Sequence, residues 1–411
     1  MNYYCIEGVL CASMTALDFP EVAPPKEGEA LVYLTHLPCQ ENRAKFRVTH
    51  PAQLVSSGES VAWLDPKRLP LAPPLPVEVL TRISKGTLSA VNYNHPRWRE
   101  LLSPIAKPTG KLRVHLVAVG DVGGTFATGL KLLGGDCIET IGLFDLNPAS
   151  VERWVQELGQ VNYCDGNPAM PTVESVTGTA LFDCDVLVFA ATKTIPAVGS
   201  DIADVRMAQL GANRELIAHY GKLAREAHFG GLFMVLSDPV DPLCRKVYEA
   251  SNQGEDGQWD GMGLLPEQVQ GFGLGVMQAR AMYYAKEAGI EQLDAVRSFG
   301  PHGQGLVVAN SLDAYDHALS EALTIQVITA NLKIRELGYK PYVAPALSSG
   351  AFQLLCALRG QYHESSVCLG GIWFGARNRF TPYGVEVMTQ TIPDALYQRL
   401  VETQAQLYNI G

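Results

Sequence analysis

Short apolar runs, separated by polar, glycine and proline positions, recur along the chain from Leu112 onward. Four of these runs predict buried strands, at 112–119, 141–145, 186–191 and 232–237. Helical patterns lie between them, up to Leu133 and from about 201 to 227. Because parallel strands need a crossover connection, this alternation predicts a doubly wound α/β sheet.

The first 110 residues have a different pattern. Runs that begin at Glu29, Lys45 and Ser60 are short and rich in β-branched and aromatic residues, which predicts a small sheet. Residues 69–76 are proline-dense, and residues 76–85 predict a helix. We therefore expect a small β-rich extension of unknown role at 1–110, with the doubly wound sheet following it.

Composition narrows the range of functions. Of the 411 residues 47% are hydrophobic and 18% charged, which is typical of a folded protein. The net charge of −10 has the wrong sign for a protein that binds nucleic acid. No apolar run is long enough to span a membrane and no signal peptide is recognisable, so we expect a cytoplasmic protein without a membrane partner. Nine scattered cysteines without a Cys-x-x-Cys pair indicate reduced core residues, with neither a disulfide framework nor a metal site.

The turn after the first predicted strand carries a weak dinucleotide-binding fingerprint. It reads Ala118-Val-Gly-Asp-Val-Gly123, with alanine where G-x-G-x-x-G begins. Gly120 and Gly123 would allow the backbone to approach a pyrophosphate at a helix N-terminus, whereas Ala118 weakens the match. A turn that contains glycine for structural reasons alone is the alternative.

Asp145 strengthens this interpretation. It ends the second predicted strand, where a carboxylate can accept hydrogen bonds from a ribose; capping of the segment that begins at Asn147 is the alternative. No arginine follows Asp145 to bind a ribose phosphate, so the sequence favours NAD over NADP.

Six segments, in their order along the chain, resemble the lactate/malate dehydrogenase family. They begin at Val117, Ile141, Asp185, Leu236, Gln270 and Phe299, and the resemblance covers about residues 112 to 410. It implies a Rossmann-type NAD-binding domain at 111–274 and an α+β catalytic domain at 275–411. It also implies hydride transfer between NAD and C2 of a 2-oxo or 2-hydroxy acid, a small carboxylate substrate, and a homo-oligomer, either dimer or tetramer. The implied cofactor contacts are Ala118, Gly120, Asp121, Val122, Gly123, Asp145, Ala191, Thr192 and Asp238.

The resemblance also implies roles for single residues. His302, in Gly-Pro-His-Gly, matches the histidine that moves the proton, and Arg280 matches the residue that binds the substrate carboxylate. Arg206 matches an arginine on a mobile loop that polarises the reacting carbonyl. Lys340 lies in a segment similar to one that lines the substrate pocket. A structural histidine and surface arginines are the alternatives.

Two departures from the family pattern bear on the chemistry. Met277 stands where the family has the carboxylate partner of the histidine, and Asp238 stands where the family has Asn. Asp238 could pair with His302 in a different geometry, or could favour a cationic substrate such as an iminium. It could also only cap the helix that follows it.

Three functions therefore remain open from the sequence. The first is an NAD-dependent dehydrogenase of 2-hydroxy acids, with His302 as acid and base. The second is an imine or opine-type reductase, in which Asp238 complements positive charge. The third is a catalytically silent NAD-binding sensor or interaction protein, since loss of the histidine's partner is a change that inactivity would tolerate.

Overall fold

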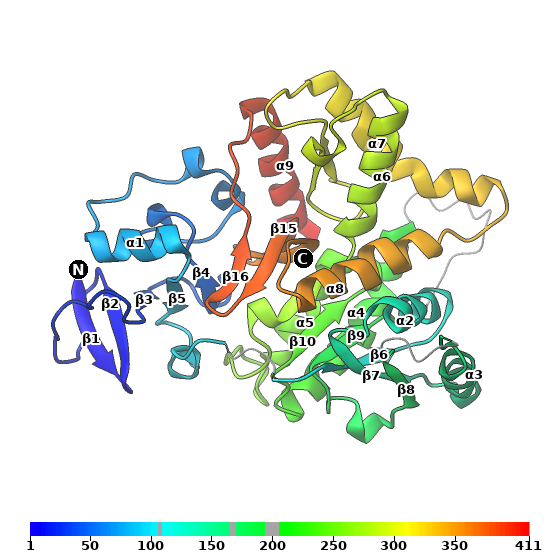
Figure 1. The fold of residues 1–411 in the computed structure, drawn as a ribbon, viewed down its shortest axis with the longest axis horizontal. Coiled ribbons are helices and arrows are strands. Elements are labelled where there is room, and N and C mark those ends of the chain that lie inside the picture. The colour runs from blue at the N-terminus through cyan, green and yellow to red at the C-terminus, as the bar shows by residue number, and fades with distance from the viewer. Residues whose placement is uncertain (106–108, 164–169, 194–204, 411) are drawn as a thin grey trace.

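A computed structural model describes residues 1–105, 109–163, 170–193 and 205–410 (Figure 1). Its largest feature is one continuous sheet, in which the strands follow the order β1-β2-β3-β5-β4-β16-β15-β14-β11-β10-β9-β6-β7-β8. These strands are β1 Asn2–Ile6, β2 Val9–Ser13, β3 Val32–Thr35, β4 Lys45–Arg47, β5 Ser89–Asn92, β6 Leu112–Val117, β7 Ile138–Phe144, β8 Thr172–Ser175, β9 Val186–Phe189, β10 Leu232–Val235, β11 Val269–Gly271, β14 His363–Leu369, β15 Ile372–Thr381 and β16 Gly384–Val387.

The half of the sheet from β11 to β8 is a doubly wound domain of the expected class. Its six strands are all parallel, in the order 3-2-1-4-5-6 when counted from β6. Alternate residues of β9 point to opposite faces: Val186 and Val188 pack under α2, α3 and α8, and Leu187 and Phe189 pack under α4 and α5. These helices are α2 Asp121–Leu133, α3 Pro148–Gly159, α4 Val205–Glu226, α5 Val240–Ser251 and α8 Phe352–Leu358.

The C-terminal third adds antiparallel strands and a second group of helices. Strand β14 pairs with β11, and β15 and β16 follow it in antiparallel order. The strands β12 Arg297–Phe299 and β13 Val307–Ala309 form a separate hairpin. The remaining elements here are α6 Leu274–Glu287, α7 His317–Glu336, a π-helix at Pro345–Ala351 and α9 Asp394–Ile410.

The N-terminal extension is not a separate sheet. Strand β4 pairs in parallel with β16, where Phe46 lies opposite Val385, so β1 to β5 prolong the sheet of the C-terminal part (Figure 1). The chain gives no local signal for this pairing, because the two strands are more than 300 residues apart. The expected division at residues 110 and 274 stays a prediction.

Most predicted elements of the doubly wound domain are confirmed, and the extension shows the main errors. The helix predicted at 76–85 is α1, Val77–Lys85, and β3 and β4 occupy two of the three predicted runs. The third run is instead a 3₁₀ helix at Val61–Leu64, begun by Ser60, whose hydroxyl accepts the Ala62 N–H. A local side-chain cap thus outweighs the β-propensity of this segment.

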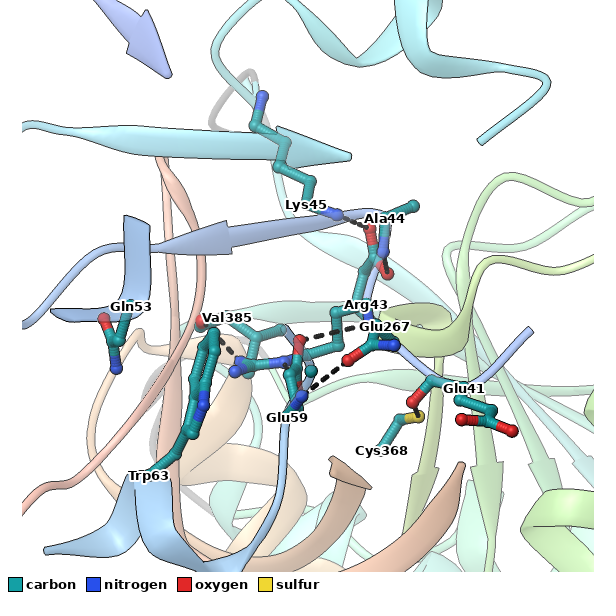
Figure 2. Close-up of polar contacts among 12 residues, drawn as sticks. Glu41, Arg43, Ala44, Lys45, Gln53, Glu59, Trp63, Glu267, Cys368 and Val385 are labelled. Carbon is teal, nitrogen blue, oxygen red and sulfur yellow. Dashed lines mark hydrogen bonds and ion pairs between the residues drawn. The ribbon is translucent and has the colours of Figure 1, made fainter. Parts of the chain in front are cut away.

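Buried charges join the extension to the rest of the molecule, and Figure 2 shows them. The Glu267 carboxylate accepts the backbone N–H groups of Ala44 (3.1 Å) and Lys45 (2.9 Å), at the start of β4. Beside it, Arg43 Nε lies 2.8 Å from Glu59 Oε2, with both side chains almost fully buried. Arg43 Nη1 also donates to the Val385 carbonyl in β16 (3.1 Å).

Burial raises the pKa of Glu267 from 4.5 to about 7. The folded protein therefore binds a proton here that the unfolded chain has lost, so this group lowers stability as pH rises from 4.5 towards 7. We expect Glu267→Gln to fall in stability less steeply than wild type across that window, because the amide does not ionise. Thermal unfolding of both proteins at a series of pH values measures the difference. Parallel stability–pH curves for the two would contradict this expectation.

The structure also bears on what the sequence predicted about cysteines, membrane spans and metal sites. The eight described cysteines are free; Cys11, Cys244 and Cys368 are buried as expected, whereas Cys5 is exposed and is not a core residue. Cys164 lies outside the described residues. Within the described ranges, none of the helices combines the length and apolar content needed to cross a membrane. Nor do three His, Cys, Asp or Glu side chains there gather as a metal would require.

Candidate functional site

The turn between β6 and α2 lies at the centre of the parallel strands, where the strand order reverses. The Ala118 N–H donates to the Phe144 carbonyl (2.8 Å), and Ala118 adopts a left-handed conformation, with φ +75°. That conformation explains why the fingerprint usually has glycine at this position, and alanine adopts it at a cost of about 1 kcal/mol. The turn therefore has the expected shape despite the substitution.

The two glycines of this turn differ in what surrounds them. A Cβ on Gly123 would lie 2.1 Å from the Ala118 carbonyl oxygen, so the fold itself requires glycine there. A Cβ on Gly120 would meet no atom of the described residues within 4 Å, and its φ of −71° suits any residue. Nothing in the described fold requires glycine at 120, which leaves the N-terminus of α2 open to a close ligand.

Asp145 braces this turn. One carboxylate oxygen accepts the Val119 N–H (2.9 Å), and the other accepts the Asn147 N–H (2.9 Å). Asn147 itself is the N-cap of α3, through its contact with the Ala149 N–H. Asp145 thus supports the segment that begins at Asn147, and it directly follows the end of β7. Its predicted contact with a ribose stays a prediction.

Hydrogen bonds from Asn213 of α4 join the ends of β9 and β10. This fully buried side chain donates to the Asp238 carbonyl (2.9 Å) and accepts the Lys193 N–H (3.0 Å). It also exchanges a hydrogen bond with Thr192 Oγ1, and Ser237 Oγ donates to the Ala191 carbonyl (2.6 Å). In the sequence, the only signal for this role was a side-chain amide in the middle of a helical pattern.

His302 and Asp238 meet beside these strand ends. His302 lies in the loop of the β12–β13 hairpin, and its Nδ1 is 3.1 Å from Asp238 Oδ1. The imidazole is 9% exposed and the carboxylate 35%, so the contact is largely shielded from water. Pro239, and not Asp238, occupies the N-cap position of α5. The geometry thus favours the pairing of Asp238 with His302 over a helix-capping role.

The backbone of His302 is held separately. Its N–H donates to Asp241 Oδ2 (3.2 Å), and Ser366 Oγ donates to the other oxygen of that carboxylate. Burial raises the pKa of Asp241 to about 6, against the opposing effect of these hydrogen bonds. A Cβ on Gly273 would lie only 2.5 Å from the His302 Cβ, so glycine at the start of α6 makes room for the histidine.

Arg280 and Met277 lie on the same helix, α6. Met277 is fully buried, and its sulfur is 3.8 Å from Arg280 Nη1, while Arg280 is half-buried. Met277, at the position of the family's carboxylate, is therefore part of the apolar core. Asp238, which contacts His302, comes instead from the turn between β10 and α5.

The structure gives less information about Arg206 and Lys340, the other two predicted substrate contacts. Arg206 belongs to the first turn of α4, but its side chain is not described, and the preceding residues 194–204 also lie outside the described ranges. Lys340 Nζ lies 3.0 Å from Asp121 Oδ2, at the N-terminus of α2, with both side chains half-exposed. Lys340 thus contacts the predicted cofactor turn, and its role towards substrate stays a prediction.

Comparisons with known proteins agree with this fold. No family model matches the chain. L-lactate dehydrogenase of Treponema denticola is 28% identical over 184 residues, which are 44% of this chain and 51% of that protein; the chain thus matches about half the length of this curated relative.

Solved structures match over a longer range. A lactate dehydrogenase from a Medee basin deep-sea metagenome library (18% identity) and a minor L-lactate dehydrogenase of Enterococcus mundtii (19%) each have a TM-score of 0.60, covering 74% of this chain and 98% of theirs. Malate dehydrogenase of Archaeoglobus fulgidus, solved in complex with NADH, has a TM-score of 0.60 at 18% identity, covering 72% and 98%. The chain therefore has the fold of these lactate and malate dehydrogenase structures, with additional sequence outside the matched part.

Proposed function

We propose that this protein is an NAD-dependent oxidoreductase that interconverts a 2-oxo acid and the corresponding 2-hydroxy acid. The observation that carries the proposal is the contact between His302 Nδ1 and Asp238 Oδ1, at the carboxyl end of the parallel strands. Ligands of doubly wound sheets bind at this edge, where the strand order reverses. The fold and the relatives named above support the same class of reaction.

His302 would exchange the proton. With Nδ1 donating to Asp238, the neutral ring carries its lone pair on Nε2, and Asp238 would stabilise the imidazolium when Nε2 gains a proton. During reduction the substrate carbonyl oxygen takes the proton from Nε2 as C2 gains hydride, and oxidation reverses both transfers. Two residues would hold His302 in place. Asp241 accepts the His302 backbone N–H, and Gly273 leaves room for the His302 Cβ.

Substrate would be bound through its carboxylate. Arg280, on the helix that begins beside His302, offers a guanidinium fork that fits two carboxylate oxygens. Arg206 would polarise the carbonyl oxygen, where negative charge develops. These assignments, with that of Lys340, rest on sequence order and on the position of the helices.

The residues around the β6–α2 turn fit NAD. The open backbone at Gly120 and the N-terminus of α2 suit a pyrophosphate, and Asp145 lies where a ribose hydroxyl would donate. Val122, Gly123, Ala191 and Thr192 would complete the contacts. When bound, NADH supplies the hydride. Association into dimers or tetramers and a cytoplasmic location stay predictions.

The first experiment is NADH consumption against a panel of 2-oxo acids, each with and without an amine, repeated with His302→Ala. Turnover of a 2-oxo acid alone, lost in His302→Ala, is the expected result. NADH oxidation that requires the amine would instead identify an imine or opine-type reductase. NADH binding without any turnover would favour the silent sensor.

A pair of alanine variants tests the cofactor turn independently of turnover. We expect Gly120→Ala to unfold at the temperature of wild type but to bind NADH at least about tenfold more weakly, because the added methyl group obstructs only a ligand. Gly123→Ala is the matched control, and its clash with the Ala118 carbonyl should lower the melting temperature itself. Fluorescence titration with NADH and thermal unfolding measure the two effects. Unchanged affinity in Gly120→Ala would argue against a pyrophosphate at this turn.

A further inference from the structure

A cavity of about 490 Å³ lies between the extension and the C-terminal part. Residues of α1, β4 and the segment after β4 line one side, and Tyr362, Glu386, Met388 and Thr389, in β16 or next to β14 and β16, line the other. None of the residues assigned to the candidate active site lines it. Its volume falls within the range of small-molecule sites.

One end of the cavity is positively charged. The Glu386 carboxylate accepts hydrogen bonds from Arg47, Arg379 (2.8 Å) and the Tyr362 hydroxyl. Two guanidinium groups thus share one carboxylate, which leaves an excess of one positive charge. Arg47 Nε is buried and makes no hydrogen bond with any described residue. The Arg47 side chain as a whole is 17% exposed and lines the cavity, so its guanidinium group is the cation that an anionic ligand would meet there.

The fold makes room for Arg47. A Cβ on Gly86 would lie 1.6 Å from Arg47 Nη2, so any side chain there would displace the guanidinium. Gly86 ends α1 in a left-handed conformation, with φ +65°. The Arg47 guanidinium therefore packs against Gly86 at the C-terminus of α1, and it also donates a hydrogen bond to Glu386 of β16.

The rest of the lining is apolar or carries hydroxyl groups. Leu80 and Ile83 of α1 face the cavity together with Met388, and Leu80 is 40% exposed. Ser84 and Thr49 add hydroxyl groups. A site with one excess positive charge and an apolar wall suits a monoanion with a hydrocarbon body better than a compact dianion, which would leave the apolar wall unused.

We propose that this cavity binds a small monocarboxylate with an apolar body, and that the bound molecule holds the extension against the C-terminal part. The carboxylate lies at the Arg47 guanidinium group, and the hydrocarbon body packs between Leu80, Ile83 and Met388. Because residues from both parts line the site, occupancy stabilises their docked arrangement.

Thermal unfolding of the full-length protein with 4-methylpentanoate tests this proposal. We expect a saturable rise in melting temperature of about 1–2 °C at ten times the Kd. The neutral amide of the same acid and inorganic phosphate should give no such rise. Ser84→Trp, which fills the cavity from the exposed side of α1, should abolish the rise, whereas Ser84→Ala should retain it.

A second variant distinguishes binding in the cavity from binding at the candidate active site, where Arg280 is proposed to bind a carboxylate. Arg280→Met should retain the rise if the carboxylate binds in the cavity. A rise that survives in Ser84→Trp but disappears in Arg280→Met would overturn the proposal, as would an equal response to phosphate or no saturable response at all. The readout is binding, so it is independent of whether the protein turns over a 2-oxo acid.

Discussion

Replacing Asp238 by Asn is expected to lower kcat by about 10²–10⁴-fold, with little change in KM. The carboxylate can only accept a hydrogen bond, so it fixes the proton of neutral His302 on Nδ1. An amide can instead donate from its NH₂ group, which reverses the tautomer, and it carries no charge to stabilise the imidazolium. KM should change little because Arg280, on a different helix, is the proposed carboxylate anchor.

The substitution changes one atom of the side chain and should leave the fold intact. The Asp238 carbonyl, which Asn213 binds, is backbone and is unaffected. Steady-state NADH consumption measures kcat and KM, and Asp18→Asn, the same change at an exposed position of the extension, is the matched control. An unchanged kcat in Asp238→Asn would mean that Asp238 does not assist His302, and the proposed proton transfer would lose its main support.

Replacing Arg43 by Met should lower the free energy of unfolding by about 3–5 kcal/mol. Arg43 and Glu59 are both almost fully buried, and Met would leave the Glu59 carboxylate without its countercharge (Figure 2). The variant also loses the hydrogen bond to Val385 that joins the extension to β16. Burial already raises the pKa of Glu59, so the loss should be smaller at acid pH, where the carboxyl group is neutral.

Urea unfolding followed by tryptophan fluorescence suits this measurement, because Trp63 stacks on the Arg43 guanidinium, 5.8 Å from its ring centre. The double variant Arg43→Met/Glu59→Gln is the control, since it removes both charges and should recover much of the lost stability. If the double variant were as unstable as Arg43→Met, lost packing and not an uncompensated charge would be the cause.

The N-terminal extension thus depends on a few buried polar contacts for its position. Glu267 binds the start of β4, and Arg43 binds the Val385 carbonyl near the start of β16. Each contact joins residues more than 200 positions apart. The proposed carboxylate site lies at the same junction. A ligand there and the buried charges would both stabilise the extension in its position against the C-terminal part.

The sequence by itself determined the features that depend on local order. The alternation of apolar runs specified the parallel strands and their helices, because burial on both faces and helical crossovers leave a local signature. The turn at 118–123 could be located because its backbone shape needs small residues. His302, Arg280 and Asp238 could be selected because their segments follow the order seen in dehydrogenases, and Met277 showed that a partner for His302 was missing from its usual place.

Only the tertiary structure decided which of these residues meet. Asp238 and His302 are 64 residues apart, and whether they touch depends on how α5 and the β12–β13 hairpin pack, which no local pattern records. The same holds for Lys340, which contacts Asp121 across 219 residues, and for β4, which joins β16. Strand partners are chosen by hydrogen bonds and burial between distant segments, so the sequence specified a β-rich extension but not the sheet to which it belongs.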